Sequence, residues 1–570
     1  MSAGAAPLRR ARLRRGLLAV MFMVAALAVA LAFVWPLFGI GWYQNHDMVA
    51  YPVRAVEYVA GWRSGAIWPR WAPDLYGGYG CPLFNFYAPG LFIVSGLMIL
   101  MGASATLALK LTLVLFTAVG AVCAFGVVWG ECKRADAALV AATVFVFMGY
   151  HLTLVYVRGD LAEYCATCLT PAVLWSYRAL GRVGPSRLLP VALAAALTHA
   201  ATLLVHTLTG QWLTEFVLGI VGYTAWVSWR AGDRARAQII FVTFTCACAM
   251  TAVYALPALL ERPLVHIERM TAGGLATQRN VIEDLRLLHT RGFFYVGRAI
   301  ELLPLLALAS MVRRRRALGD VITWTLLSVA MVLLMSRFAA PLWQWLPFGS
   351  YIQFPWRLLS FLSLFAALAW GAAWRWLVPS RTAVAWPLAI VVAAAVTYDG
   401  WQNLPATIAP LPSTQVPTTA AEIGHGIYST VISDEYLPRT AAARPMVPLR
   451  AFSLSIDNAT VDSLLRSGTG YKLEVGAGDG ASVELRGFWF PGWRVITRSG
   501  PTAATLEPSP LGYLRLKLPQ KGYYRLLVQF QLTPLRAAAT VTSYFATAVL
   551  LFAVQLLRRR ARDVPPPSTA

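Results

Sequence analysis

Residues 16–47 read GLLAVMFMVAALAVALAFVWPLFGIGWYQNHD, and the change at residue 41 from an apolar run to a polar loop decides the class of fold. The run 16–40 has no charged residue, and it is longer than the ~20 residues that an α-helix needs to cross a bilayer. It is also longer than the ~7 to 15 apolar residues of a signal peptide. We therefore interpret it as an uncleaved first span with a cytoplasmic N-terminus. Basic residues precede it: Arg9, Arg10, Arg12, Arg14 and Arg15.

The composition of the whole chain agrees with a membrane protein. Of 570 residues, 58% are hydrophobic and 13% are charged, and the mean hydropathy is +0.58. The formal net charge of +23 comes largely from arginine clusters between apolar runs, which is the pattern that keeps loops on the cytoplasmic side. No soluble segment shows a basic face with interleaved aromatic residues, so we predict no nucleic-acid partner.

About twelve apolar segments have the length of spanning helices. They lie near residues 17–40, 105–129, 136–156, 161–180, 188–209, 211–229, 238–259, 297–312, 321–336, 357–378, 382–398 and 540–557. A further run, 89–102, is shorter than the ~20 residues of a perpendicular span. If it does not cross, basic clusters such as those at Lys133, Arg178, Arg230 and Arg558 fall on the cytoplasmic side. We therefore predict a polytopic α-helical membrane protein with about twelve transmembrane helices, a juxtamembrane or re-entrant element at 89–102, and both termini in the cytoplasm.

Composition divides the chain into three parts. Residues 1–398 are predicted to form a transmembrane domain with a first external loop at 41–104. Residues 399–539 lose the long apolar runs and gain alternation, as in YKLEV at 471–475 and YLRLKL at 513–518. This period of two, interrupted by Gly- and Pro-rich turns, predicts an extracytoplasmic β-sandwich-like domain. Residues 540–570 then form the last transmembrane helix and a basic cytoplasmic tail.

The first external loop begins with His46 and Asp47 directly after the first span. A carboxylate at the bilayer surface could serve as a base for a sugar hydroxyl, but it could also be an ordinary solvated acid. The loop also contains Arg54, Glu57 and many aromatic residues such as Tyr87. Aromatic residues form interfacial belts, and they also bind the faces of sugar rings, so both interpretations stay open for each of them.

A second constellation is RGDLAE at 158–163, in a tight external turn between two spans. Charged groups at a helix junction are costly unless they face water, pair with each other or line a cavity. Arg158 and Glu163 could neutralise each other, with Asp160 beside them. Alternatively, the planar guanidinium of Arg158 could receive a phosphate.

His206 and Arg357 are expected at the same depth, because each lies at the external end of a predicted span. A lone histidine at a helix end is most often a structural hydrogen-bonding group. Arg357, at the outer end of a span, runs against the positive-inside bias, which favours a specific anionic partner. No P-loop, Rossmann glycine pattern or HExxH motif occurs in a suitable context.

These features resemble the GT-C superfamily of membrane glycosyltransferases. More narrowly, His46-Asp47, the segment 76–89, RGDLAE at 158–163 and HTLT at 206–209 resemble bacterial membrane proteins described as 6-pyruvoyl-tetrahydropterin synthase-related. FPGW at 490–493 and LPQKGY at 518–523 are similar to YfhO-like membrane proteins. The pterin description itself implies nothing here, since the chain has no zinc-histidine set for that soluble chemistry.

The resemblance implies transfer of a sugar from a polyprenyl-phosphate donor to a glycan or lipid acceptor at the extracytoplasmic face of the cytoplasmic membrane. It implies that Asp47, with His46 beside it, deprotonates the acceptor in an inverting displacement, while Arg158 and Arg357 bind the donor phosphate. Asp160, Glu163, His206, Arg54, Glu57 and Tyr87 would support the site or contact substrate. The chain has His46-Asp47 in place of an acid pair, so we predict a metal-independent enzyme without a cofactor.

Two other functions remain open at this stage. A lipid-glycan flippase or transporter would also place charge within the membrane, although the ionisable residues gather at one face rather than through the bilayer midplane. A non-catalytic assembly protein whose β-rich domain binds glycan is the third possibility.

Overall fold

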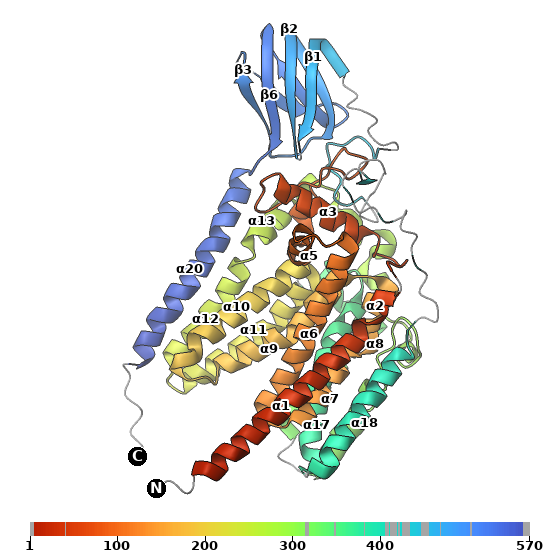
Figure 1. Ribbon diagram of the computed structural model, residues 1–570, viewed down its shortest axis with the longest axis vertical. Helices are drawn as coiled ribbons and strands as arrows, with labels where there is room; N and C mark the ends of the chain where they lie inside the picture. The colour runs from red at the N-terminus through yellow and green to blue at the C-terminus, as the bar shows by residue number, and fades with distance from the viewer. Residues whose placement is uncertain are drawn as a thin grey trace.

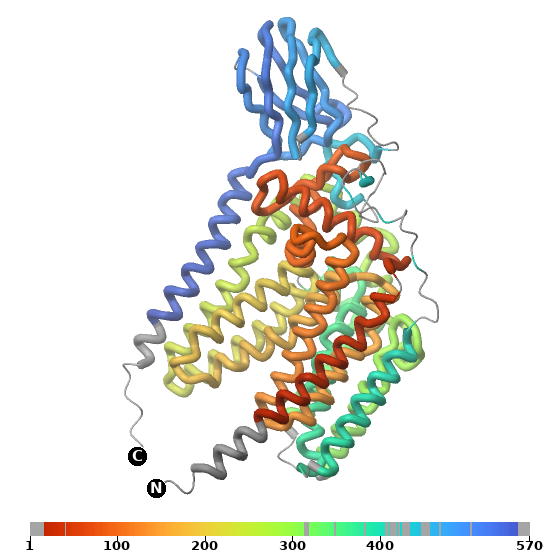
Figure 2. Tube along the Cα trace, in the orientation of Figure 1, coloured from red at the N-terminus to blue at the C-terminus, as the bar shows by residue number. Residues whose placement is uncertain are grey.

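The computed structural model describes residues 5–39, 41–313, 318–346, 349–380, 382–404, 410, 416, 419, 422–423, 434–445, 455–467, 469–501 and 504–562. A bundle of long helices carries an antiparallel sheet at one end (Figure 1). Helix α1 runs toward the end of the bundle that bears the sheet, and α20 runs from the sheet back toward the opposite end (Figure 2).

Long helices occupy the segments that were predicted from apolar runs. They are α1 (Ala5–Val34), α6 (Ala105–Cys132), α7 (Ala135–Val146), α9 (Leu161–Leu180), α10 (Leu188–Val205), α11 (Thr207–Arg230), α12 (Arg234–Ala249), α15 (Leu303–Arg313), α16 (Leu318–Met335), α17 (Leu359–Leu377), α18 (Thr382–Trp401) and α20 (Pro534–Arg562). Within the described residues, 6 helices are long and apolar enough to cross a membrane, or up to 8 if two bent pairs each count as one span. The helical class is therefore confirmed, and about twelve spans stays a prediction.

Two segments that were predicted as continuous spans are bent. Helix α7 is followed by α8 (Gly149–Leu152) and the π-helix η1 (Thr153–Arg158) at an angle of 45°. Helix α12 meets α13 (Ala252–Leu260) at 59°. The backbone is closely packed at the first bend, where a Cβ on Gly149 would lie 2.1 Å from the carbonyl oxygen of Tyr295. Apolar periodicity did not reveal either bend.

The first external loop is largely helical. It contains α3 (Ala50–Arg63), α4 (Leu83–Phe86) and α5 (Gly90–Leu100), and α3 packs against both α5 and α6. At 1.5 Å per residue, α5 is roughly 16 Å long, about half the thickness of a bilayer core. Its length agrees with the predicted juxtamembrane or re-entrant element.

Basic helix junctions meet at the end of the bundle opposite the sheet. Arg236, at the start of α12, donates a hydrogen bond to the carbonyl oxygen of Leu180 at the end of α9 (2.9 Å). Arg134, between α6 and α7, donates to the carbonyl oxygen of Val378 just after α17 (2.8 Å). Each of these basic residues is thus bound to the end of another helix, and the cytoplasmic position of the basic clusters stays a prediction.

The C-terminal sheet has six strands. They are β1 (Ser455–Ser467), β2 (Gly470–Phe488), β3 (Trp493–Ser499), β4 (Thr505–Pro508), β5 (Tyr513–Leu518) and β6 (Gly522–Phe530). The order is β3-β6-β2-β5-β4, and β1 pairs with the other edge of β2. Buried and exposed positions alternate along β2 and β5, which confirms the predicted period of two.

The sheet differs from the predicted sandwich, because the described strands form one sheet rather than two. The long strand β2 causes this, since one half of it pairs with β6 and the other half with β5. Strands β3 and β4 contact each other, so the sheet curls. The sheet rests on the first external loop: the Phe488 N–H donates to the Tyr79 carbonyl (2.9 Å), and the ring of Trp71 lies 5.4 Å from that of Trp493.

Candidate functional site

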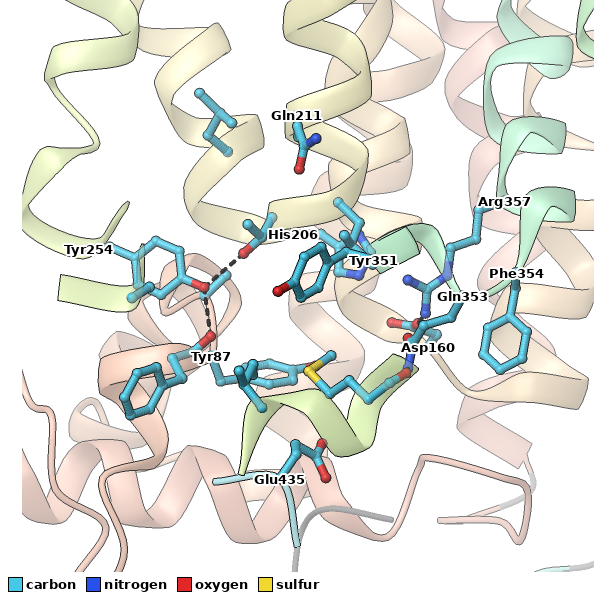
Figure 3. A pocket seen from close by; sticks show the side chains of 18 of the residues that line it. Tyr87, Asp160, His206, Gln211, Tyr254, Tyr351, Gln353, Phe354, Arg357 and Glu435 are labelled. Carbon is cyan, nitrogen blue, oxygen red and sulfur yellow. Dashed lines mark hydrogen bonds and ion pairs between the residues drawn. The ribbon is translucent and has the colours of Figure 1, made fainter. Parts of the chain in front are cut away.

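A cavity of about 1040 Å³ lies where the first external loop meets the helix ends nearest the sheet. Its walls come from α3, the turn before α9, the α10–α11 junction, α13, the start of α17 and the segment 434–437 before the sheet (Figure 3). Eight of the ten residues proposed from sequence line it: His46, Asp47, Arg54, Tyr87, Arg158, Asp160, His206 and Arg357. Glu57 and Glu163 are not among its lining residues.

The turn at 158–160 is shaped by Gly159. Its φ of 74° is in the left-handed region that favours glycine, and a Cβ there would lie 2.1 Å from the amide oxygen of Asn45. This close approach lets the Asp47 N–H donate to the Arg158 carbonyl (3.1 Å). Two segments far apart in sequence are thereby joined at the cavity.

A compact charged cluster follows from this turn. Asp160 caps α9 by accepting a hydrogen bond from the Glu163 N–H (3.1 Å). Arg158 contacts Glu163 through Nη1 (2.8 Å) and Asp160 through Nη2 (3.1 Å). The Arg158–Glu163 pair that was an alternative to phosphate binding is therefore present, and Arg158 still lines the cavity.

Arg357 joins the same cluster from the 3₁₀ turn η12 (Pro355–Leu358) at the start of α17. Its Nε lies 3.2 Å from Glu163 Oε2, and its Nη2 lies 3.9 Å from Asp160 Oδ2. Its Nη1 is buried without a hydrogen-bond partner among the described residues. A buried donor on a cation is costly to leave unsatisfied, so Nη1 of Arg357 is a candidate donor to an anionic ligand.

The carboxylate of Asp47 is only partly buried, and it forms no hydrogen bond or ion pair with the described residues. Burial and the nearby charge of Asp160 raise its pKa above the ordinary aspartate value, while Arg158 opposes the rise. A raised pKa brings a carboxylate closer to the basicity that general-base catalysis at neutral pH needs.

Two tyrosines also contact the charged groups of the cavity. Tyr51 donates a hydrogen bond to Asp160 (3.0 Å), and its hydroxyl lies 3.3 Å from that of Tyr87. The guanidinium of Arg54 lies 4.1 Å from the centre of the Tyr87 ring. Tyr87 therefore lines the cavity with its ring already in contact with a cation.

His206 caps the N-terminus of α11. The Thr209 N–H donates to its Nδ1 (3.3 Å), and burial lowers the pKa of His206 to about 3. In the neutral ring this leaves the proton on Nε2. Arg158 holds the pKa of Asp160 well below its usual value, against the effect of burial.

Asp160, Glu163 and His206 could nevertheless supply metal ligands, since one candidate atom from each lies within 4.8 Å of the others. No metal site was predicted from the sequence. Both carboxylates are already in contact with guanidinium groups, and a metal needs an unprotonated imidazole nitrogen. The three side chains therefore supply donor atoms for a metal. The two carboxylates, however, already have arginine as their counter-charge, and Nδ1 of His206 accepts the Thr209 N–H.

Glu57 lies away from the cavity wall. It is fully buried in α3 and accepts a hydrogen bond from the Asp74 N–H (3.0 Å), and burial and Asp74 raise its pKa well above the ordinary value. These contacts position the loop after α3, so we do not propose Glu57 as a substrate ligand. Glu163 lies behind the cavity wall, where it contacts the two arginines.

Several other cavity residues were not proposed as site residues from the sequence. Gln211 and Glu215 extend the wall along α11, Tyr254 comes from α13, and Glu435 and Tyr436 come from the segment before the sheet (Figure 3). A charged or amide side chain inside an apolar run could have identified Gln211 and Glu215. No pattern in 399–454 placed Glu435 beside the first external loop.

The bundle and its charged cavity define the class of this chain as a polytopic α-helical membrane protein. The chain belongs to the family described as 6-pyruvoyl-tetrahydropterin synthase related domain, membrane protein, whose model matches residues 84–404. The resemblance to this family is therefore confirmed. No curated protein matches the chain.

Solved structures with a similar backbone arrangement include two glycosyltransferases. The archaeal oligosaccharyltransferase AglB from Archaeoglobus fulgidus, in complex with an inhibitory peptide and a dolichol-phosphate, has a TM-score of 0.41 and 15% identity, over 75% of this chain and 61% of that one. The arabinofuranosyltransferase AftD from Mycobacteria has a TM-score of 0.39 and 17% identity, over 68% of this chain and 27% of that one. This chain thus corresponds to only part of the length of either protein.

Proposed function

We propose that the protein is a membrane glycosyltransferase that moves a sugar from a polyprenyl-phosphate donor to a glycan or lipid acceptor at the extracytoplasmic face of the cytoplasmic membrane. One observation carries the proposal: a single cavity is lined by the carboxylate of Asp47 and by Arg357. Among the residues that the structure describes, that carboxylate has no hydrogen-bond or ion-pair partner, and Nη1 of Arg357 is buried without an acceptor. A base and a phosphate-binding cation are the two groups that such a transfer needs.

The reaction would be an inverting displacement. An acceptor hydroxyl oxygen attacks the anomeric carbon, and its proton passes to the carboxylate of Asp47. The bond between the anomeric carbon and the phosphate oxygen breaks, and the lipid phosphate leaves with the bonding electrons. Arg357 and Arg158 stabilise the charge that develops on that phosphate.

Glu163 would act as a positioning residue in this mechanism. It is fully buried and contacts both arginines, so it fixes two long side chains in one place before the donor arrives. Phe354 adds to this, since its ring centre lies 5.5 Å from each guanidinium. Arginines held in this way lose little further freedom when they bind phosphate.

We also propose that the enzyme is independent of metal ions. The two arginines supply the positive charge that a divalent cation would otherwise provide. The neutral His206 would have to give up its helix cap before it could bind a metal, because its unprotonated Nδ1 accepts the Thr209 N–H.

The direct test uses purified full-length protein in detergent with a panel of polyprenyl-phosphate sugars and measures release of lipid phosphate. Asp47→Asn should lower turnover at least ~100-fold, the usual contribution of general-base catalysis, and membrane insertion should be unchanged. Asp457→Asn, at an exposed position of β1, is the matched control. Translocation of a lipid-linked glycan without phosphate release, or an Asp47→Asn variant with full activity, would contradict the proposal.

The membrane orientation belongs to the same proposal, with about twelve spans and both termini in the cytoplasm. Single cysteines introduced at residues 47 and 133 test it. An impermeant thiol reagent should label position 47 from outside the cell and position 133 only after permeabilisation. Labelling of position 133 from outside would overturn the orientation.

A further inference from the structure

A second cavity, of about 840 Å³, lies between the first external loop and the sheet, apart from the site described above. Its walls come from the C-terminal half of α3, the end of α5, the start of α6, and strands β2 and β6. The two cavities share no lining residue. The second cavity is therefore separate from the site described above.

The charge of this cavity is entirely positive among its described lining residues. Arg63, the last residue of α3, and Lys472 on β2 both line it, and no aspartate or glutamate does. Neither cation forms an ion pair with any residue that the structure describes, and both are exposed. Two unpaired cations that face one cavity from different elements favour an anionic ligand.

The apolar surface next to the cavity identifies the kind of anion. Ser104 lines the cavity, and Leu107, Leu111 and Leu115 follow it along one face of α6 with exposures of 41%, 37% and 45%. Residues spaced by three and four share a helix face. An exposed apolar stripe therefore descends into the membrane from directly below the cationic cavity.

The end of α5 continues this surface. Leu97, Leu100 and Met101 are 52%, 49% and 79% exposed, and Ile99 between them lines the cavity. A cationic cavity above lipid-facing leucines matches a molecule with an anionic headgroup and acyl chains. A soluble anion would contact only the cations, whereas a phospholipid would contact the cations and the apolar stripe together.

We propose that this cavity binds the headgroup of an anionic phospholipid, with its acyl chains against α5 and α6. The headgroup phosphate contacts Arg63 and Lys472, so the lipid links the sheet to the first external loop. Helix α3 gives this link a consequence for the other site, because Tyr51 and Arg54 at its beginning line the large cavity while Arg63 at its end lines this one. Bound lipid would hold α3 in the position that presents Arg54.

The experiment measures lipid binding to detergent-solubilised full-length protein, with phosphatidylglycerol and phosphatidylcholine of identical acyl chains as probes. Phosphatidylglycerol should bind in preference. The double variant Arg63→Glu/Lys472→Glu should weaken its binding by roughly tenfold or more, since each cation near a membrane surface contributes about 1 kcal/mol. The matched control is Arg498→Glu/Lys521→Glu, which makes the same charge change at exposed positions toward the far end of the sheet.

Equal binding of both lipids, or a double variant that binds phosphatidylglycerol as the unmodified protein does, would overturn the proposal. Glycerol phosphate distinguishes the two sources of phosphate: if it competes at concentrations close to those of the lipid, the site is a soluble-anion site and the proposal fails. The single variants Arg63→Gln and Lys472→Gln keep the test valid if the double variant is unstable, and each should weaken binding to an intermediate degree. None of these measurements depends on glycosyltransferase activity.

Discussion

Nε of Arg357 lies 3.2 Å from Oε2 of Glu163, which joins the start of α17 to the start of α9 at the wall of the large cavity. Glu163→Gln keeps the shape of this side chain and removes its charge, so Arg158 and Arg357 lose most of their compensation. Removing one partner of a buried ion pair costs about 3–5 kcal/mol, and thermal unfolding should show a loss of this size. Glu215→Gln, at a cavity-lining position that forms no ion pair with the described residues, should change stability by less than about 0.5 kcal/mol. Equal effects of the two variants would contradict the positioning role of Glu163.

Arg357→Lys tests whether the geometry of the guanidinium, and not its charge alone, binds the donor phosphate. An ammonium group lacks the planar fork that matches two phosphate oxygens. The variant should bind polyprenyl phosphate at least about tenfold more weakly, measured as its inhibition constant in the transfer assay. Arg337→Lys is the control, because Arg337 is exposed between α16 and α17 and does not line the cavity. An unchanged inhibition constant would remove Arg357 from the phosphate site.

The raised pKa of Asp47 predicts a pH dependence. Asp47 must be deprotonated to act as a base, so kcat/KM should rise with pH through this pKa, above the ordinary aspartate value of about 3.9. Arg54 lowers the pKa of Asp47 and Asp160 raises it. Arg54→Gln should therefore move the acidic limb to higher pH, and Asp160→Asn should move it to lower pH. A limb that stays in place in both variants would show that another group titrates.

The charged cluster could be located from the sequence because charge is rare in apolar segments. Arg158, Asp160 and Arg357 each lie where an apolar run begins or ends, and such positions are costly unless they face a cavity or a partner. That these residues lie at the same depth in the membrane could be predicted, because successive spans cross in opposite directions and each residue lies at an external end. The contact between Arg357 and Glu163 could not be predicted, because it depends on which helices are neighbours.

The first external loop shows where the sequence was insufficient. Nothing in the sequence separated Arg54 from Glu57 as candidate site residues. The segment folds as α3, in which Arg54 lines the cavity and Glu57 accepts a hydrogen bond from the Asp74 N–H. Aromatic residues obscured the helical period. Glu435 was missed for a different reason, since only the docking of the sheet onto this loop brings it to the cavity.

Metal independence is tested by chelation. Protein treated with EDTA should retain its transfer activity within about twofold, and added Mg²⁺ or Mn²⁺ should not increase it, because guanidinium groups already contact the carboxylates near His206. Lost activity that Mn²⁺ restores would instead assign Asp160, Glu163 and His206 as ligands. His206→Gln would then abolish the metal response.

We expect Arg536 to fix the sheet to the helices. It is fully buried at the start of α20, and its Nε and Nη2 lie 3.0 and 2.9 Å from Glu261 Oε2. Its guanidinium also lies over the rings of Phe490 and Phe530 next to β3 and at the end of β6. Arg536→Gln leaves Glu261 without its cation and should cost about 3–5 kcal/mol in thermal unfolding.

The double variant Arg536→Met/Glu261→Leu separates the ion pair from its surroundings. Replacing a buried pair by apolar residues is often close to neutral, so the double variant should recover most of the stability lost in Arg536→Gln. The recovery should be incomplete, because the Asn85 side chain donates a hydrogen bond to Glu261 (2.6 Å) and would lose its acceptor. A double variant less stable than Arg536→Gln would show that the pair itself contributes net stability.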